Sequence, residues 1–258
     1  GEQFSAQTDE HVAILRLRGD VYQIAQDFAV KESFFKLLEV FEGDANLNCL
    51  LVVSDHEVLG EAGHEKFWSR TLGLRTGTQT EPVARADRAE LRAAREENTL
   101  VQVCRAFVQS SKLIVTAADG SVVGPFFGSM LAGDFRITTN RSSIVFPHVK
   151  FRMAPLGAIG YYLPRYIGPS LARSHLLFGT PLSAVRAREL GLLDAVVAVD
   201  EYFEKSLAFA RQVASIPRAV VKHTKELLQL EWDHFDEFVD WESSHIRLDD
   251  AARPELDS

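Results

Sequence analysis

The chain has 258 residues, of which 46% are hydrophobic and 25% are charged, and its formal net charge is −8. This composition is ordinary for a globular protein with a sizeable core, and the length allows one large domain or two. The acidic balance argues against a general binder of nucleic acid or of anionic membranes, since both depend on clustered Lys and Arg.

The cysteines and the first residues bear on the compartment in which the protein works. Cys49 and Cys104 both lie in apolar stretches, which favours buried thiols in a reducing compartment over a disulfide framework. No apolar run is long enough to cross a membrane. Residues 1–20 lack the basic-then-apolar pattern of a signal peptide. We therefore expect a cytoplasmic protein without a nucleic-acid or membrane partner.

The first part of the chain alternates between strand and helix patterns. One helix is expected to end at Gly43, and a longer one is expected to run from about Arg85 to Ser110. The polar, glycine-bearing residues 55–64 predict a loop. Alternating or continuous apolar runs predict strands over residues 11–19, 49–54, 112–119, 135–139 and 143–146.

The second part of the chain is mostly helical. Helix patterns cover residues 168–179, 183–191 and 200–215, and one more strand is expected at 194–199. Residues 219–248 are expected to be helical and carry a broad apolar face, for which core packing and a subunit interface or ligand lid are both open interpretations. The members of this face are Trp232, Phe235, Phe238, Val239 and Trp241.

Taken together, these patterns predict two regions in one chain. Strand and helix alternate over residues 1–196, which predicts an α/β core. Residues 197–258 are expected to form a helical C-terminal region that serves in trimerisation or as a lid.

Four stretches, in order along the chain, resemble the crotonase superfamily, also called enoyl-CoA hydratase/isomerase. Residues 50–67 resemble the family's strand and F-S-A-G-A-D loop, and residues 112–137 resemble its glycine-rich segment that ends in C-D-x-R-I. Residues 146–168 resemble its P-E-V segment, and residues 176–197 its L-L-T-G segment. The resemblance implies an α/β fold of the ClpP/crotonase-like kind, a spiral of ββα units with a helical C-terminal region. It also implies a homotrimer or hexamer.

In that family, two backbone N–H groups from glycine-bearing loops stabilise the enolate oxygen of an acyl-CoA thioester, and one or two carboxylates move the protons. By position, the first N–H donor would be that of His64, and the second would come from the residue after Gly124. No cofactor is implied beyond the coenzyme A of the substrate, and no metal is expected. The remaining substrate-binding positions implied by the resemblance are Glu61, Ala62, Gly63, Gly124, Pro125 and Gly128.

The sequence departs from the family at the groups that carry this chemistry. The residue after Gly124 is Pro125, which has no N–H, and losing one such donor costs about 3–4 kcal/mol of transition-state stabilisation. The N–H of Phe126 is the candidate substitute. The positions that resemble the two catalytic glutamates hold Gly128 and His148, so both carboxylates are missing.

Two groups of charged or titratable side chains have alternative interpretations. His148 is either a general base with a pKa near neutrality or a hydrogen-bonded ring in a collapsed pocket. Lys66, Arg70 and Arg75 follow the first loop, where they either meet a CoA phosphate or are simply solvated. His56 and the other acidic and histidine residues of this loop lack the spacing of a helical zinc motif.

Three functional classes remain open from the sequence. The leading one is an enzyme that acts on a CoA thioester by isomerisation, decarboxylation or unusual hydration, with His148 as the proton carrier. The second is a C–C bond hydrolase that acts on a diketone without CoA. The third is a non-catalytic crotonase-fold protein that binds a ligand or supports an assembly.

Overall fold

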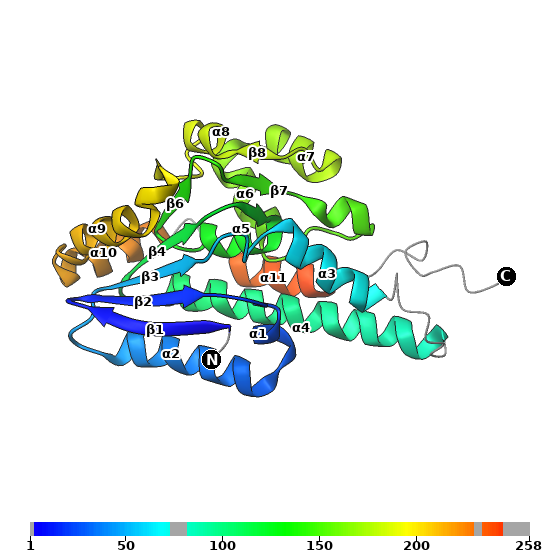
Figure 1. Ribbon diagram of the computed structural model, residues 1–258, viewed down its shortest axis with the longest axis horizontal. Helices are drawn as coiled ribbons and strands as arrows, with labels where there is room; N and C mark the ends of the chain where they lie inside the picture. The colour runs from blue at the N-terminus through cyan, green and yellow to red at the C-terminus, as the bar shows by residue number, and fades with distance from the viewer. Residues whose placement is uncertain (1–2, 73–81, 230–233, 245–258) are drawn as a thin grey trace.

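The computed structural model describes residues 3–72, 82–229 and 234–244, and a six-stranded sheet runs through it (Figure 1). The strand order is β1-β2-β3-β4-β6-β9; β1 pairs with β2 antiparallel, and all other neighbours are parallel. The strands are β1 (Phe4–Asp9), β2 (Val12–Leu17), β3 (Cys49–Ser54), β4 (Leu113–Ala118), β6 (Phe135–Thr139) and β9 (Ala195–Val197).

A second, three-stranded sheet stands beside the first. It has the order β5-β7-β8, with β5 parallel to β7 and β7 antiparallel to β8. Its strands are β5 (Ser121–Val123), β7 (Ser143–Val145) and β8 (Leu182–Ser183). Because β5 leads directly into the helix Gly124–Leu131, this small sheet fixes where Gly124 and the start of that helix lie.

Helices surround both sheets. The first five are α1 (Gln23–Gln26), α2 (Phe28–Gly43), α3 (Glu61–Leu72), α4 (Pro82–Gln109) and α5 (Gly124–Leu131). The later ones are α6 (Ile159–Ile167), α7 (Pro169–Phe178), α8 (Ala184–Glu189), α9 (Tyr202–Ala214), α10 (Arg218–Gln229) and α11 (Phe235–Ser244). Two 3₁₀ turns, η1 (Pro147–Phe151) and η2 (Val199–Glu201), complete the set. Among the described residues, every helix is too short or too polar to cross a lipid bilayer.

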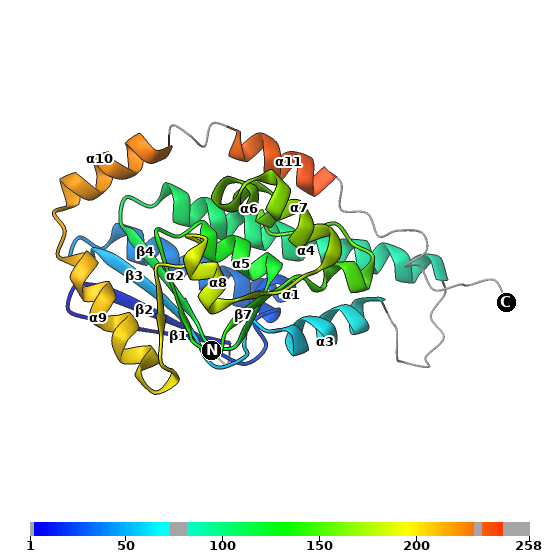
Figure 2. The same cartoon turned by 90° about the horizontal axis from the view of Figure 1, so that it is seen from above.

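The core has two parts, one on each face of the six-stranded sheet. The larger cluster joins α2, α4, α5 and α6 to one face, and a smaller cluster joins α9 to the other. Figure 2 shows α9 and α4 on opposite sides of the sheet. The strands β3 and β4 are buried along their whole length because they are covered on both faces, as their continuous apolar sequences predict.

Two local expectations were wrong. The strand β1 was not predicted, because its sequence is largely polar and three of its six residues are exposed at the edge of the sheet. The loop expected over residues 55–64 ends earlier, because α3 already begins at Glu61. The long helix expected from Arg85 to Ser110 is confirmed as α4, within a few residues at its start.

The aromatic tail face packs mostly into the core. Phe235 and Val239 are buried, and the Phe235 ring lies 5.1 Å from that of Tyr161 in an edge-on contact. Trp241 is 59% exposed, and Trp232 lies outside the described residues. Core packing is therefore confirmed for the buried members, whereas the division of the chain at residue 196 remains a prediction.

Candidate functional site

The loop that begins at residue 55 is anchored to β5 by the carboxylate of Glu57. Glu57 accepts hydrogen bonds from the backbone N–H of Ser121 at 2.7 Å and from its hydroxyl at 2.6 Å. Ser121 Oγ in turn accepts the N–H of Glu61 at 3.2 Å. Gly120 has a φ of +93°, and a Cβ there would overlap the Glu57 carboxylate. These contacts place the starts of α3 and β5 side by side.

The N–H expected to be the first oxyanion donor is used inside α3. The backbone N–H of His64 donates to the carbonyl of Gly60 at 3.3 Å. This differs from the expectation of a free donor, and the cause is the early start of α3 at Glu61. A helix that includes this residue turns its N–H along the helix axis toward the preceding turn.

The ring of His64 is part of a buried aromatic cluster. It is 2% exposed, and its Nε2 accepts the indole N–H of Trp68 at 3.1 Å. Its Nδ1 must then carry the proton, and this atom has no hydrogen-bond partner among the described residues. Burial, together with the smaller electrostatic effects of His148 and Lys150, lowers the pKa of His64 to about 3. The ring is therefore neutral at physiological pH.

The second loop carries α5, and backbone fills the space beside it. A Cβ added at Gly128 would overlap the carbonyl oxygen of Gly157 and would lie 2.9 Å from the backbone nitrogen of Ile159. A Cβ at Gly157 would in turn lie 2.5 Å from the carbonyl oxygen of Pro125. Gly157 has a φ of +74°, a conformation that favours glycine. A side chain at Gly128 therefore has no room, because the backbone of Gly157 and Ile159 fills the space beside it.

Two buried carboxyl groups hold this backbone in position. Glu97 on α4 accepts the N–H of Gly157 at 2.8 Å, and Glu242 on α11 accepts the N–H of Ala158 at 3.0 Å. Burial, together with a side-chain hydrogen bond to Glu97, raises the pKa of Glu242 to about 10. Glu242 therefore keeps its proton at neutral pH. The sequence analysis missed this pair, although Glu242 follows Val239 by three positions on the buried face of the tail helix.

His148 lies in η1 and is also buried. Its Nε2 is 2.8 Å from the carbonyl oxygen of Leu176, and because a carbonyl only accepts, this nitrogen carries a proton. Burial lowers the pKa of His148, and the hydrogen bond to Leu176 partly opposes this. Two residues further along, Lys150 forms ion pairs with Glu61 and, at 3.2 Å, with Glu65. These ion pairs connect η1 to α3.

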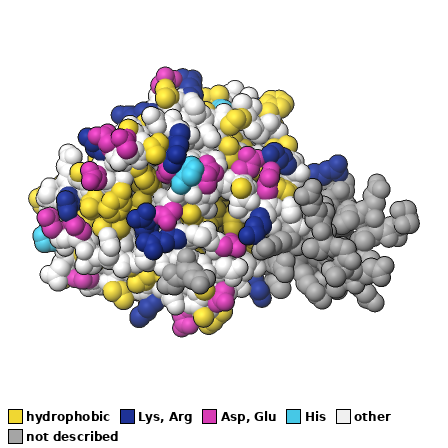
Figure 3. Space-filling model, viewed as in Figure 1, with side chains coloured by type: hydrophobic (Ala, Val, Ile, Leu, Met, Phe, Trp, Pro, Cys, Tyr) yellow, Lys and Arg dark blue, Asp and Glu magenta, His cyan; other side chains and the backbone are white. Residues whose placement is uncertain are grey.

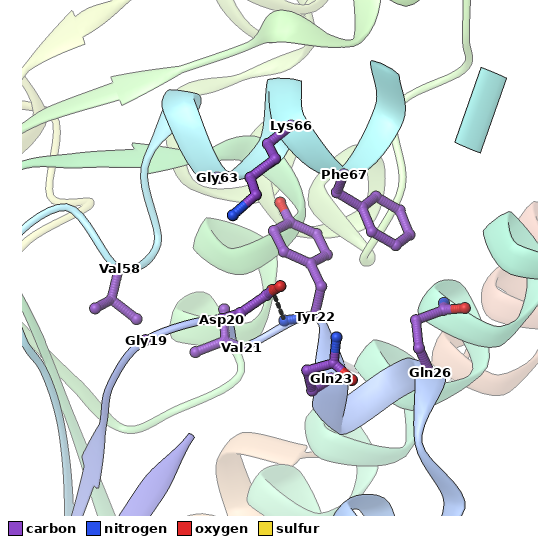
Figure 4. A pocket seen from close by; sticks show the side chains of 10 residues that line it. All are labelled: Gly19, Asp20, Val21, Tyr22, Gln23, Gln26, Val58, Gly63, Lys66 and Phe67. Carbon is purple, nitrogen blue, oxygen red and sulfur yellow. Dashed lines mark hydrogen bonds between the residues drawn. The ribbon is translucent and has the colours of Figure 1, made fainter. Parts of the chain in front are cut away.

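Two cavities lie next to these loops. The outer cleft has a volume of about 470 Å³ and opens over the start of α3 (Figure 4). It is lined by Gly19, Asp20, Val21, Tyr22, Gln23, Gln26, Val58, Gly63, Lys66 and Phe67. The inner chamber measures about 90 Å³, is predominantly apolar, and lies between α1, α4, α5 and the large sheet. Val21 and Tyr22 line both.

The candidate residues from the sequence are distributed unevenly around these cavities. Gly63 lines the outer cleft, and Phe126 lines the inner chamber. Six others line neither cavity, namely Glu61, Ala62, Gly124, Pro125, Gly128 and His148. His64 also lines neither, although its ring is 6.3 Å from that of Tyr22.

Of the three basic residues considered for a phosphate, Lys66 lines the outer cleft. The side chain of Arg70 and the whole of Arg75 lie outside the described residues. On the face shown in Figure 3, basic and acidic side chains are interspersed among the described residues. No group of three or more potential metal ligands is found in the described part of the chain.

Several proteins of known type resemble this chain in sequence. A probable enoyl-CoA hydratase of Mycobacterium tuberculosis is 25% identical over 224 residues, which cover 86% of this chain and 79% of the relative. A carnitinyl-CoA dehydratase of Salmonella arizonae is 29% identical over 111 residues, or 43% of this chain and 42% of the relative. The chain thus spans less than half the length of the carnitinyl-CoA dehydratases that it matches.

Solved structures share the fold at lower identity. The enoyl-CoA hydratase of Bacillus halodurans superposes with a TM-score of 0.73 at 17% identity, over 98% of this chain and 96% of that one. An enoyl-CoA hydratase/isomerase of Pseudoalteromonas atlantica gives 0.71 at 19% identity, over 95% and 89%. The predicted crotonase fold is confirmed. The family model described as enoyl-CoA hydratase/isomerase matches residues 76–237, more than half of the chain, and the chain therefore belongs to that family.

Proposed function

We propose that this protein binds a coenzyme A thioester in the outer cleft and holds it without adding water to it by the two-glutamate route. Family membership supports the ligand class, since the relatives are named as enoyl-CoA hydratases and carnitinyl-CoA dehydratases. The cleft offers a cation in Lys66 for a phosphate, and the amides of Gln23 and Gln26 for the polar linker of a CoA arm.

The observation that carries the second half of the proposal is the position of the Gly157 carbonyl. It lies where a side chain at Gly128 would begin, so no carboxylate fits there. Pro125 has no N–H, and the N–H of His64 donates to the carbonyl of Gly60, so neither of these two positions offers a free donor. The N–H of Phe126, in the first turn of α5, remains the candidate substitute. Each missing donor costs about 3–4 kcal/mol of transition-state stabilisation.

A second candidate function, a CoA-thioester enzyme with His148 as base, is favoured by one observation. The Nε2 proton of His148 is fixed on the Leu176 carbonyl, so the lone pair of a neutral ring resides on Nδ1. The lowered pKa keeps that ring neutral and able to accept a proton at pH 7. Against this candidate, His148 lines neither the outer cleft nor the inner chamber.

Calorimetric titration with CoA and butyryl-CoA, paired with a hydration assay on crotonyl-CoA, tests the proposal. Saturable binding without turnover supports it. Turnover in the wild type that is abolished in His148→Ala would favour the second candidate. If neither CoA nor butyryl-CoA binds, a coenzyme A thioester is excluded as the ligand. Cytoplasmic location and a homotrimeric or hexameric assembly remain predictions from the sequence.

A further inference from the structure

The last described helix, α11, lies along the outside of the molecule next to α6 and α4 (Figure 2). Its apolar side chains face inward. The rings of Phe235 and Phe238 lie 5.1 Å and 5.3 Å from the ring of Tyr161 on α6, and Val239 is buried. Aromatic packing against α6 therefore attaches this helix to the core.

One polar contact of α11 acts on the backbone between η1 and α6. Glu242 accepts the N–H of Ala158 at 3.0 Å, next to the N–H of Gly157 that Glu97 of α4 accepts. Ala158 has a φ of +59°, and Gly157 has a φ of +74°. For alanine this conformation costs free energy, and it persists only where the surrounding contacts hold it. Glu242 is one of those contacts, and a buried N–H that loses its acceptor is costly.

The same backbone closes the space beside α5. The carbonyl oxygen of Gly157 overlaps the position of a Cβ at Gly128, and the backbone nitrogen of Ile159 lies 2.9 Å from that position. Two carboxyl groups from distant helices thus hold residues 157–158, and this segment in turn fills the space beside Gly128.

A buried thiol lies within this group of helices. The Sγ of Cys104 on α4 is 3.7 Å from the Oγ of Ser129 on α5, and Cys104 is fully buried. Burial, together with the nearby carboxyl groups of Glu97 and Glu242, raises the pKa of Cys104 to about 12. The thiol therefore reacts only when these helices separate.

We propose that α11 is a latch for the backbone of residues 157–159. When α11 is docked, Glu242 holds this backbone against α5 and the space beside Gly128 stays closed. When α11 leaves, the acceptor of the Ala158 N–H leaves with it, and the strained backbone relaxes away from α5. The latch would regulate the proposed thioester site, and it rests on the proposed function only for the identity of the ligand.

The two cysteines of the chain measure this opening. Cys104 belongs to the larger core cluster, whereas Cys49 is buried in the smaller cluster on the other face of the large sheet. The full chain is treated with iodoacetamide, and the alkylation of each cysteine is followed by mass spectrometry. Hydrogen exchange of the peptide that covers residues 157–159 is measured in parallel.

Three variants separate the latch from general destabilisation. Glu242→Ala removes the acceptor. Glu242→Gln is the matched control, because its amide oxygen accepts the N–H of Ala158 and its NH₂ group donates to Glu97. Phe238→Ala loosens the apolar attachment of α11 without changing either carboxyl group. Circular dichroism and a thermal melt first show that each variant is folded.

Alkylation of Cys104 is expected to be slow in the wild type and in Glu242→Gln. In Glu242→Ala and Phe238→Ala it is expected to be about tenfold faster, with faster hydrogen exchange at residues 157–159, because local opening becomes more frequent. Alkylation of Cys49 is expected to be the same in all four proteins. If Glu242→Ala does not fold, the comparison of Phe238→Ala with the wild type decides.

Three results would overturn the inference. Cys104 could react equally in the wild type, Glu242→Ala and Phe238→Ala, so that α11 would not control the opening. Cys104 could react faster without faster exchange at residues 157–159, so that α11 would move without releasing this backbone. Cys49 could accelerate as much as Cys104, so that the change would be global unfolding. The assay contains no thioester, so each of these results leaves the proposed function standing.

Discussion

The occupied space beside Gly128 predicts a strong asymmetry between two glycine-to-alanine changes. Both Gly128 in α5 and Gly63 in α3 are helical and lack a positive φ, so the backbone accepts alanine at either site. A Cβ at Gly63 would lie 3.8 Å from the Tyr22 ring, an ordinary contact. A Cβ at Gly128 would overlap the Gly157 carbonyl oxygen, which belongs to backbone and cannot rotate away.

The magnitudes follow from these contacts. Alanine gains about 0.5–1 kcal/mol of helix propensity at either site. At Gly128, overpacking costs about 1–3 kcal/mol. The displaced loop also loses the hydrogen bond from Gly157 to Glu97, and leaving such a buried group without its partner costs about 1–3 kcal/mol. We expect Gly128→Ala to lose about 3 kcal/mol of unfolding free energy, and Gly63→Ala to be neutral or slightly stabilised.

Urea denaturation followed by circular dichroism measures both variants against the wild type. The expected result is a lower midpoint for Gly128→Ala with an unchanged slope, since the slope reports surface exposed on unfolding. Equal midpoints for the two variants would refute the reasoning, because they would mean that the space beside α5 is open to a side chain.

Three further predictions concern single side chains. The pKa of Glu242 is raised from 4.5 to about 10 on folding. The unfolding free energy of the wild type should therefore fall relative to that of Glu242→Gln as the pH rises between these values, by at most about 1.4 kcal/mol per pH unit. Urea midpoints of the two proteins that run parallel across pH 5–9 would contradict this. His148→Ala leaves the partly buried Leu176 carbonyl without its donor and should cost about 1–3 kcal/mol, seen as a lower melting temperature. An unchanged melt would mean that the hydrogen bond is replaced. Lys66→Ala should weaken CoA about threefold to fivefold and reduce the salt dependence of binding, and an unchanged Kd would place the phosphates elsewhere.

The sequence predicts those parts of the fold whose patterns are local. The apolar runs of β3 and β4 and the long helix α4 follow from periodicity. The loss of one backbone donor at Pro125 and of a side chain at Gly128 is visible without any structure, because it depends only on residue identity.

The features that close the site depend on contacts between distant segments. Glu97 is 60 residues from Gly157, and Glu242 is 84 residues from Ala158, so no local pattern joins them. The stacking of Tyr22 on Phe67 joins the start of α1 to α3, and a single tyrosine in a turn carries no periodic signal that would predict it. A carboxylate on an otherwise apolar helix face, as at Glu242, is the one local sign that a buried partner was to be expected.

Hydration of crotonyl-CoA is the most direct test of our proposal that this chain holds a CoA thioester without adding water to it. The loss of ultraviolet absorbance from the conjugated thioester is followed with enough protein to detect one turnover per hour, in a preparation shown to bind CoA. No loss above the buffer rate is expected. A loss that scales with protein concentration would contradict the filled site.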